Sequence, residues 1–296
     1  MKSKRGLYFA ILIFSVLILS SVVSASFWDS IQKVFTGKAS SQSQNVSVTV
    51  AGGNPVTIEV PTLSAFPIED NLVAIVFTAN VSDVDGINDI NDSSVASKLT
   101  NGATTRNGVC SLIGSISSTA KSYSCSIDLW YFDSSTPWAL NVSAKDFGNG
   151  TLISNTSVFT YNQLKAMVIS PLTLTWPTVV TGAVIQQSNN DPTIINNTGN
   201  YNGVISVTAR DLIGETNPLE ILPTNSFRAG PTLGTECTAT ALVNDTMVSI
   251  TGSNSNPGNL SAGGGQANLY YCIPSVPLIS SQVYSTTAGG SWAVQY

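Results

Sequence analysis

Apolar and polar residues alternate over much of the chain from residue 46 onward. In residues 72–81, Val73, Ile75, Phe77, Ala79 and Val81 share one face, and this period of two is that of a β-strand with one buried side. The same pattern recurs in residues 46–50, 56–60, 123–131, 138–144 and 158–161. Gly, Asn, Asp and Pro separate these stretches, and no convincing helical period interrupts them. We therefore expect an all-β fold of the β-sandwich type.

The second half also contains short apolar stretches separated by turn residues, and it follows a connection that contains Pro171 and Pro177. Strands are expected at residues 178–187, 193–196, 204–209, 234–241, 247–251, 267–273, 281–285 and 292–296. The length of 296 residues allows two ordinary domains. The sequence predicts two tandem Ig-like sandwiches at 45–163 and 178–296, joined by a linker at 164–177.

The N-terminus carries the strongest localisation signal. Lys2, Lys4 and Arg5 precede an almost unbroken apolar run that begins at Leu7 and ends in small residues at 23–25. This arrangement predicts an export signal at residues 1–25, and hence an extracellular or cell-surface location. Two alternatives stay open. The run is long enough for an uncleaved membrane anchor, and the basic pair with Gly6 resembles the cut site of archaeal prepilins.

Residues 26–44 form a short amphipathic segment followed by a Ser/Gln-rich linker. Five apolar residues stand at helical spacing there: Phe27, Trp28, Ile31, Val34 and Phe35. The polar side is not basic, so a short helix covering the first domain, or a disordered segment, is favoured over an interfacial membrane helix. Any contact with a membrane is expected only through the uncleaved N-terminal segment.

Composition narrows the classes of function. The formal charge is −5, and three of the twelve basic residues lie in the signal, so the rest of the chain is more acidic still. This charge argues against nucleic acid as a partner. The chain contains no histidine, which removes Ser-His-Asp and Cys-His catalysis and His-ligated metal sites. No motif for paired-carboxylate catalysis stands out, so we expect no enzymatic activity and no catalytic residue.

Four cysteines are spaced widely along the chain: Cys110, Cys125, Cys237 and Cys272. The absence of a CxxC motif argues against zinc and thioredoxin-type chemistry, and an exported chain would hold these residues as disulfides. The sequence does not fix their pairing. A bridge between Cys110 and Cys125 would be too short to join two sheets in the immunoglobulin manner, so it would join adjacent strands or a strand to its loop.

The best candidate for ion binding is a group of acids that follows residues 72–81. Carboxylates at alternate positions suit a hard cation such as calcium, and no other cofactor is expected. The candidate ligands are Asp83, Asp85, Asp89 and Asp92. The spacing is not that of an EF-hand, and the alternative is a solvated Asp-Gly turn.

Of the nine Asn-x-Ser/Thr sequons, eight are taken as candidate sites for N-glycosylation of an exported chain. Their asparagines are Asn45, Asn80, Asn91, Asn141, Asn155, Asn196, Asn244 and Asn259. Trp130 and Phe132 lie out of phase with Tyr131, so they are candidate surface aromatics for a partner or glycan, or else packing residues.

Several short motifs resemble known surface proteins. Residues 77–161 contain Asp83-Val84-Asp85-Gly86, a Tyr123-x-Cys125 strand, and a Trp138 strand that runs into Ala144-Lys145-Asp146. This segment resembles the Ig-like and cadherin-like modules of secreted archaeal surface proteins. Residues 172–212 contain the loop Asn197-Thr198-Gly199-Asn200 and resemble filament-forming TasA/camelysin-like sandwiches, with Thr181-Gly182 in place of their Pro-Gly turn. The resemblance implies an extracellular β fold, and it also implies that Asp146 lies near the other acids as a fifth candidate calcium ligand.

A weak internal repeat suggests how the chain assembles. Tyr123-x-Cys125 precedes Trp138, and Tyr270-x-Cys272 precedes Trp292. The Trp292 strand is the last of the sequence, so the second sandwich would have an open edge that invites strand addition from other surface proteins or copies of itself. The resulting hypothesis is a non-enzymatic structural or adhesive protein of a surface layer or filament. The alternative is a glycan- or ligand-binding surface module stabilised by calcium.

Overall fold

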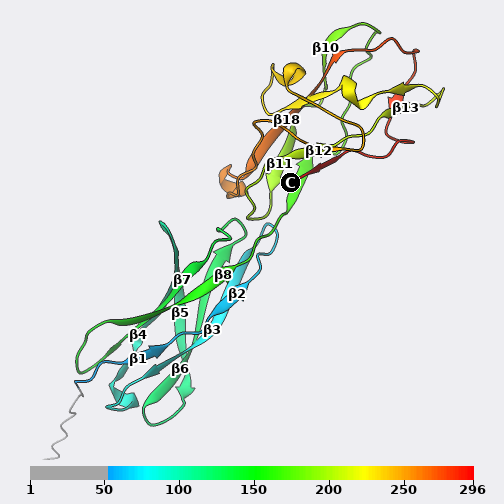
Figure 1. Cartoon of the computed structure of the whole chain (residues 1–296). Coiled ribbons are helices and arrows are strands. Elements are labelled where there is room, and N and C mark those ends of the chain that lie inside the picture. Colours follow the sequence, from blue (N-terminus) through cyan, green and yellow to red (C-terminus); the bar gives the residue numbers. More distant parts are fainter. Residues whose placement is uncertain (1–52) are drawn as a thin grey trace, which may run out of the picture. The chain divides into compact units, whose positions relative to one another are not determined.

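The computed structural model describes residues 53–296 (Figure 1). These residues form twenty strands and four short 3-10 turns, and they contain no α-helix, which confirms the all-β prediction. No helix among them is long and apolar enough to span a membrane. The predicted signal or anchor at 1–25, the segment at 26–44 and the strand at 46–50 lie outside the described residues.

The first half folds into one continuous sheet of eight strands that curls around its core (Figure 1). Its hydrogen-bonded order is β1-β3-β6-β5-β4-β7-β8-β2. The strands are β1 (Thr57–Glu59), β2 (Leu63–Ala65), β3 (Leu72–Ser82), β4 (Ile90–Asn101), β5 (Thr104–Ser115), β6 (Ala120–Trp130), β7 (Trp138–Asp146) and β8 (Ile153–Tyr161). All neighbours are antiparallel except β2 and β8.

The two ends of this sheet are occupied by consecutive segments of the chain. β1 pairs with β3, and four residues later β2 pairs with the opposite end strand, β8. Side chains of β8 also reach this segment, because Asn155 Nδ2 donates to Ile58 O at 2.7 Å and Ser157 Oγ donates to Pro61 O at 2.6 Å. Residues 57–65 therefore pair with both β3 and β8, whose outer edges would otherwise be exposed.

Strands β4 and β5 form a long hairpin that the sequence pattern did not predict. Gly102, at the first central position of the two-residue turn, has a φ of 54°, which suits the primed turns that join antiparallel strands. Two features hide the alternation of apolar and polar residues in these two strands. A register shift interrupts β4 between Asn91 and Ala96, and β5 exposes apolar residues such as Val109 and Ile113 to solvent.

The core of the first half is built from the inward residues of the alternating strands. Among the largest fully buried side chains are Trp138, Tyr123, Tyr161 and Phe159. At roughly 1.5–3 kcal/mol for each fully buried large apolar side chain, these residues stabilise the sheet in its curled form.

The second half contains three sheets of shorter strands around a separate core. The largest has the order β16-β15-β18-β11-β9, with β10 also paired to β18. Its strands are β9 (Met167–Ser170), β10 (Val184–Gln187), β11 (Thr193–Asn197), β15 (Arg228–Gly230), β16 (Thr240–Ala241) and β18 (Gln266–Ser275). The two three-stranded sheets comprise β12 (Ser206–Thr208), β17 (Met247–Ser249) and β20 (Ala293–Gln295), and β13 (Leu212–Gly214), β14 (Ile221–Leu222) and β19 (Tyr284–Ser285).

The strand predictions are less accurate in this half. The strands expected at 193–196 and 267–273 are present as β11 and β18, but only the C-terminal parts of those expected at 178–187 and 234–241 form strands, as β10 and β16. A 3-10 turn at Glu236–Thr238 occupies the middle of residues 234–241, where Cys237 is bonded to Cys272 of β18. The Cys237–Cys272 disulfide and loop packing hold these residues, so they do not need the hydrogen bonds of a regular strand. β20 pairs with β12 on one side and is an edge of its sheet.

The loop at residues 197–200, which follows β11, is buried. The side chain of Asn200 accepts from Leu164 N at 2.7 Å and donates to Asn162 O at 3.0 Å. A Cβ at position 199 would collide with Leu164 O, so only glycine fits there. The motif therefore has a structural role, in which it fixes the chain between β8 and β9.

Candidate metal centre

The acids at the end of β3 lie together in one turn. Asp83 directly follows β3, Asp85 belongs to the next turn, and Asp89 ends the 3-10 turn Ile87–Asp89. A potential ligand atom of each of these three residues lies within 4.8 Å of the others. Gly86, with φ 111°, allows the backbone to bend between them. Asp146 ends β7, opposite Ile90 in the ladder, and its charge acts on Asp83.

Each buried carboxylate uses one oxygen to hold a backbone turn. Asp83 Oδ1 accepts from Asp85 N at 2.8 Å, and Asp89 Oδ1 accepts from Gly148 N at 3.1 Å. Asp146 Oδ1 accepts from Gly150 N at 2.9 Å and from Asn149 N. The second oxygen of all three residues is buried and has no hydrogen-bond partner among the described residues.

The electrostatics of this cluster are unbalanced. Burial raises the pKa of Asp83 above its ordinary value, and the charges of Asp89, Asp85 and Asp146 raise it further against the hydrogen bond from Asp85 N. The ion pairs found within residues 53–296 involve none of these four carboxylates. The donor set consists of oxygen alone, which is the chemistry that hard divalent cations prefer.

Asp92 does not belong to this cluster. Its Oδ1 accepts hydrogen bonds from Lys121 Nζ at 2.8 Å and from the Tyr123 hydroxyl at 2.6 Å, both on β6. Desolvation acts to raise the pKa of Asp92, but these two donors outweigh it and the net pKa is lowered. The register interruption in β4 directs this side chain toward β6, which residue spacing alone did not reveal.

All four cysteines form disulfides, one in each half. Cys110 and Cys125 are bonded directly across the β5–β6 ladder, as expected for a bridge between adjacent strands. Cys237 and Cys272 join the 3-10 turn Glu236–Thr238 to β18. The described residues contain no free cysteine.

The sequons differ in how free their side chains are. Asn244 and Asn259 are exposed, and each accepts a hydrogen bond through Oδ1. In three other sequons the side-chain amide nitrogen of the asparagine donates a hydrogen bond. Asn80 donates to Glu59, Asn141 to Thr156 and Asn155 to Ile58. Asn91 and Asn196 are half-buried and accept from Ser93 and Gln266, respectively, whereas Asn45 lies outside the described residues.

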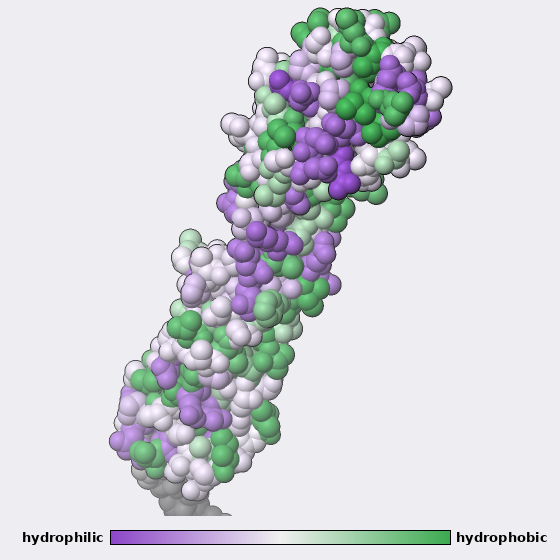
Figure 2. Space-filling model, turned by 45° about the vertical axis from the view of Figure 1, so that its right-hand side comes forward, coloured by the Kyte–Doolittle hydropathy of each residue, from purple (hydrophilic) through white to green (hydrophobic). Residues whose placement is uncertain are grey.

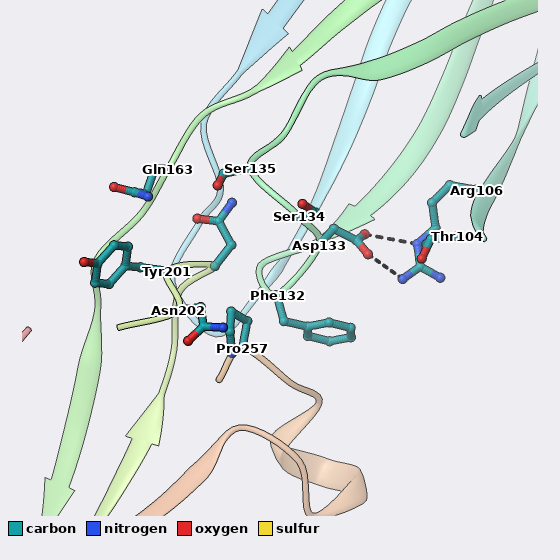
Figure 3. A pocket seen from close by; sticks show the side chains of 11 residues that line it. Thr104, Arg106, Phe132, Asp133, Ser134, Ser135, Gln163, Tyr201, Asn202 and Pro257 are labelled. Carbon is teal, nitrogen blue, oxygen red and sulfur yellow. Dashed lines mark hydrogen bonds and ion pairs between the residues drawn. The ribbon is translucent and has the colours of Figure 1, made fainter. Parts of the chain in front are cut away.

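A pocket of about 550 Å³ lies beside the turn that follows β6 (Figure 3). Polar and aromatic residues line it, including Arg106, Phe132, Asp133, Gln163, Tyr201 and Asn202. The Phe132 ring stacks on Trp130 at 5.9 Å, and Trp130 is 39% exposed, so the two aromatics singled out by the sequence are neighbours. Figure 3 shows the Arg106 guanidinium paired with Asp133 at one end of the pocket.

The sequence did not reveal a second group of acids, the half-buried Asp191 and the buried Glu236. Asp191 Oδ1 and Glu236 Oε2 are buried without a partner among the described residues, and the charge of Glu236 acts on Asp191. The two residues are 45 positions apart and no motif joins them. Only the packing of Glu236 and Asp191 around β18 brings them together.

Comparison with known proteins adds no assignment. No protein-family model matches the chain, and no curated protein matches its sequence.

Proposed function

We propose that this chain is an exported, non-enzymatic protein with a structural or adhesive role at the cell surface, as a component of a surface layer or filament. The observation that carries the proposal is that each half of the structure contains a disulfide. Disulfides persist in oxidising compartments and are rare in the cytosol. The basic and apolar N-terminal sequence supports the same location.

The strand order supports an Ig-like first module. Divided between β5 and β4, the sheet gives β1-β3-β6-β5 and β4-β7-β8-β2, which correspond to the ABED and CFG groups of an immunoglobulin sandwich with the first strand shared between them. The proposal extends the resemblance to secreted archaeal surface proteins on this basis. Such modules serve many functions, so the surface role rests on the location and the cross-links.

Assembly by strand addition is part of this proposal. β20 is an edge strand within the described residues, and an unpaired edge can accept a strand from another chain. The partner is then a second copy or another surface protein. Sizing of the purified chain at rising concentration, together with electron microscopy, tests this part. Monomers at every concentration would contradict self-assembly.

The location is tested on the source cells. We expect a membrane-impermeant amine reagent to label the protein on intact cells, and the non-reduced intact mass to show two disulfides. A cytosolic protein with residues 1–25 attached and four alkylatable thiols would refute the proposal.

A second candidate function is glycan or ligand binding at the pocket beside Phe132. Aromatic rings with nearby amide and charged groups are common features of small-molecule sites. Binding of soluble oligosaccharides, followed by NMR, would be lost in Phe132→Ala and retained in Phe147→Ala, an exposed residue outside the pocket lining. Equal behaviour of the two variants would exclude this function for the pocket.

A further inference from the structure

Three aspartates of the first half are buried with half of each carboxylate unused. Asp83, Asp89 and Asp146 are 1%, 6% and 1% exposed. In each, Oδ1 is bound by backbone N–H groups while Oδ2 has no partner within the described residues. A buried carboxylate without compensation is costly. The carboxylates of Asp83 and Asp89 lie within 4.8 Å of each other, and the charge of Asp146 acts on Asp83, so the unpartnered oxygens indicate a ligand in this turn.

A proton does not resolve this arrangement. One shared proton satisfies two of the oxygens at most, and backbone N–H donors favour the ionised form of the carboxylates they bind. Asp85 adds a fourth negative charge, with a ligand atom within 4.8 Å of Asp83 and Asp89. A cation compensates all of these groups at once.

We propose that Asp83, Asp85, Asp89 and Asp146 form a binding site for one calcium ion. Calcium takes six to eight oxygen ligands in flexible geometry, and the four carboxylates with water can supply them. Magnesium is the weaker fit, because it usually retains most of its water and binds through one or two carboxylates.

The site would join segments that are distant in the sequence. Asp83, Asp85 and Asp89 belong to the connection from β3 to β4, whereas Asp146 is the last residue of β7. Asp85 also accepts from Asn54 N at 3.0 Å and from Asn54 Nδ2 at 3.1 Å. Calcium would therefore fix two loops at one end of the sheet, together with the segment that leads into β1.

The test is calcium binding by the full chain after treatment with EDTA and removal of the chelator. We expect isothermal titration with CaCl2 to show one site, and MgCl2 to bind at least tenfold more weakly. At free calcium about 100 times the dissociation constant, the midpoint of thermal unfolding would rise by about 5–10 °C. An absence of both binding and thermal shift would overturn the proposal.

Variants locate the ion. Asp89→Asn and Asp146→Asn would abolish the thermal shift, and Asp85→Asn, which changes an exposed residue and leaves the buried turns intact, would weaken binding at least tenfold. Asp128→Asn, an exposed aspartate on β6, is the matched control and would bind as the wild type does. Wild-type affinity in Asp85→Asn together with an unchanged thermal shift in folded Asp89→Asn would place the ion elsewhere and refute the site.

Discussion

Arg106 holds Asp133 through two hydrogen bonds, from Nε to Oδ2 at 3.0 Å and from Nη2 to Oδ1 at 2.6 Å. Asp133 is 4% exposed and also accepts from Trp130 N at 2.8 Å. The pair thus fixes the turn that follows β6 and presents Phe132 to the pocket.

Removal of this guanidinium leaves a buried carboxylate without its counter-charge. We expect Arg106→Ala to lower the free energy of unfolding by about 2–3 kcal/mol, and Arg106→Lys by about 1 kcal/mol, because lysine keeps the charge but loses the paired geometry. Urea unfolding measures both. Lys98→Ala, at an exposed position of β4, is the control, and an equal loss in Lys98→Ala and Arg106→Ala would contradict the prediction.

The second half is expected to lose stability as the pH rises. Burial, assisted by the charge of Glu236 and opposed by the hydrogen bonds from Tyr271 N and Ser188, raises the pKa of Asp191 from 3.8 to about 6. A raised pKa means that the folded protein binds the proton more tightly. The stabilisation is complete below about pH 4 and is lost as the pH rises through 6, by about 1–2 kcal/mol after solvent screening.

Asp191→Asn tests this pH dependence. The amide keeps an acceptor for Tyr271 N and removes the titrating charge, so the slope of stability between pH 4 and 7 should flatten and stability at pH 7 should increase. Denaturant unfolding in the presence of EDTA measures the slope without calcium effects. A slope that is unchanged in Asp191→Asn and in the control Asp128→Asn would assign the titration to another group.

The two disulfides should contribute similar amounts of stability. In the loop-closure description, the bridge over 15 residues contributes about 3 kcal/mol and the bridge over 35 residues about 4 kcal/mol. The paired variants Cys110→Ala/Cys125→Ala and Cys237→Ala/Cys272→Ala should show these losses in urea unfolding. Losses below about 1 kcal/mol in both would mean that packing alone holds these strands.

Glycans should be found more often on sequon asparagines whose side-chain amide nitrogen makes no hydrogen bond within the protein. Asn244 and Asn259 are exposed, and none of the hydrogen bonds within residues 53–296 uses their amide nitrogens. In Asn141 and Asn155 the amide nitrogen donates to the protein. Glycopeptide mass spectrometry of the native protein should find the first pair modified more fully than the second. The reverse order would show that glycans are added before these contacts form.

The sequence predicted the elements whose burial alternates strictly. β3, β6 and β7 follow the period of two, and their inward residues form the first core. The pattern failed for β5, because Val109 is 74% exposed and its neighbours give no clear buried face. It also failed for residues 234–241, where a disulfide and a 3-10 turn decide the conformation.

The acidic site was predictable in part. The spacing of Asp83, Asp85 and Asp89 placed them in one turn, but Asp92 followed the register of β4 and paired with Lys121 instead. The sequence could not reveal the buried carboxylate oxygens without partners. Which oxygen of Asp89 is left over depends on the folded loop, where Gly148 N donates to the other one. The tyrosines of the internal repeat differ as well, since Tyr123 is buried and Tyr270 is only half-buried.

Exposed apolar side chains occur on both halves, as the surface in Figure 2 shows. The most exposed are Leu219, Leu278 and Leu172, all in the second half. Val76 and Val109 face solvent on either side of Ser126 in the first sheet. Single apolar side chains on a surface are normal, so no role is assigned to them.

The pairing of β2 with β8 determines how the first half responds to a pulling force. The chain enters through β1 and β2 and leaves through β8, and the last two strands run parallel, with Leu63 opposite Phe159. Tension between the two ends therefore loads the hydrogen bonds between β2 and β8 in shear, so that the bonds resist together instead of opening one after another. Asn162 adds two further bonds to Ala65 O at the end of this pair. The sheet is thus arranged to transmit load along the chain without unzipping.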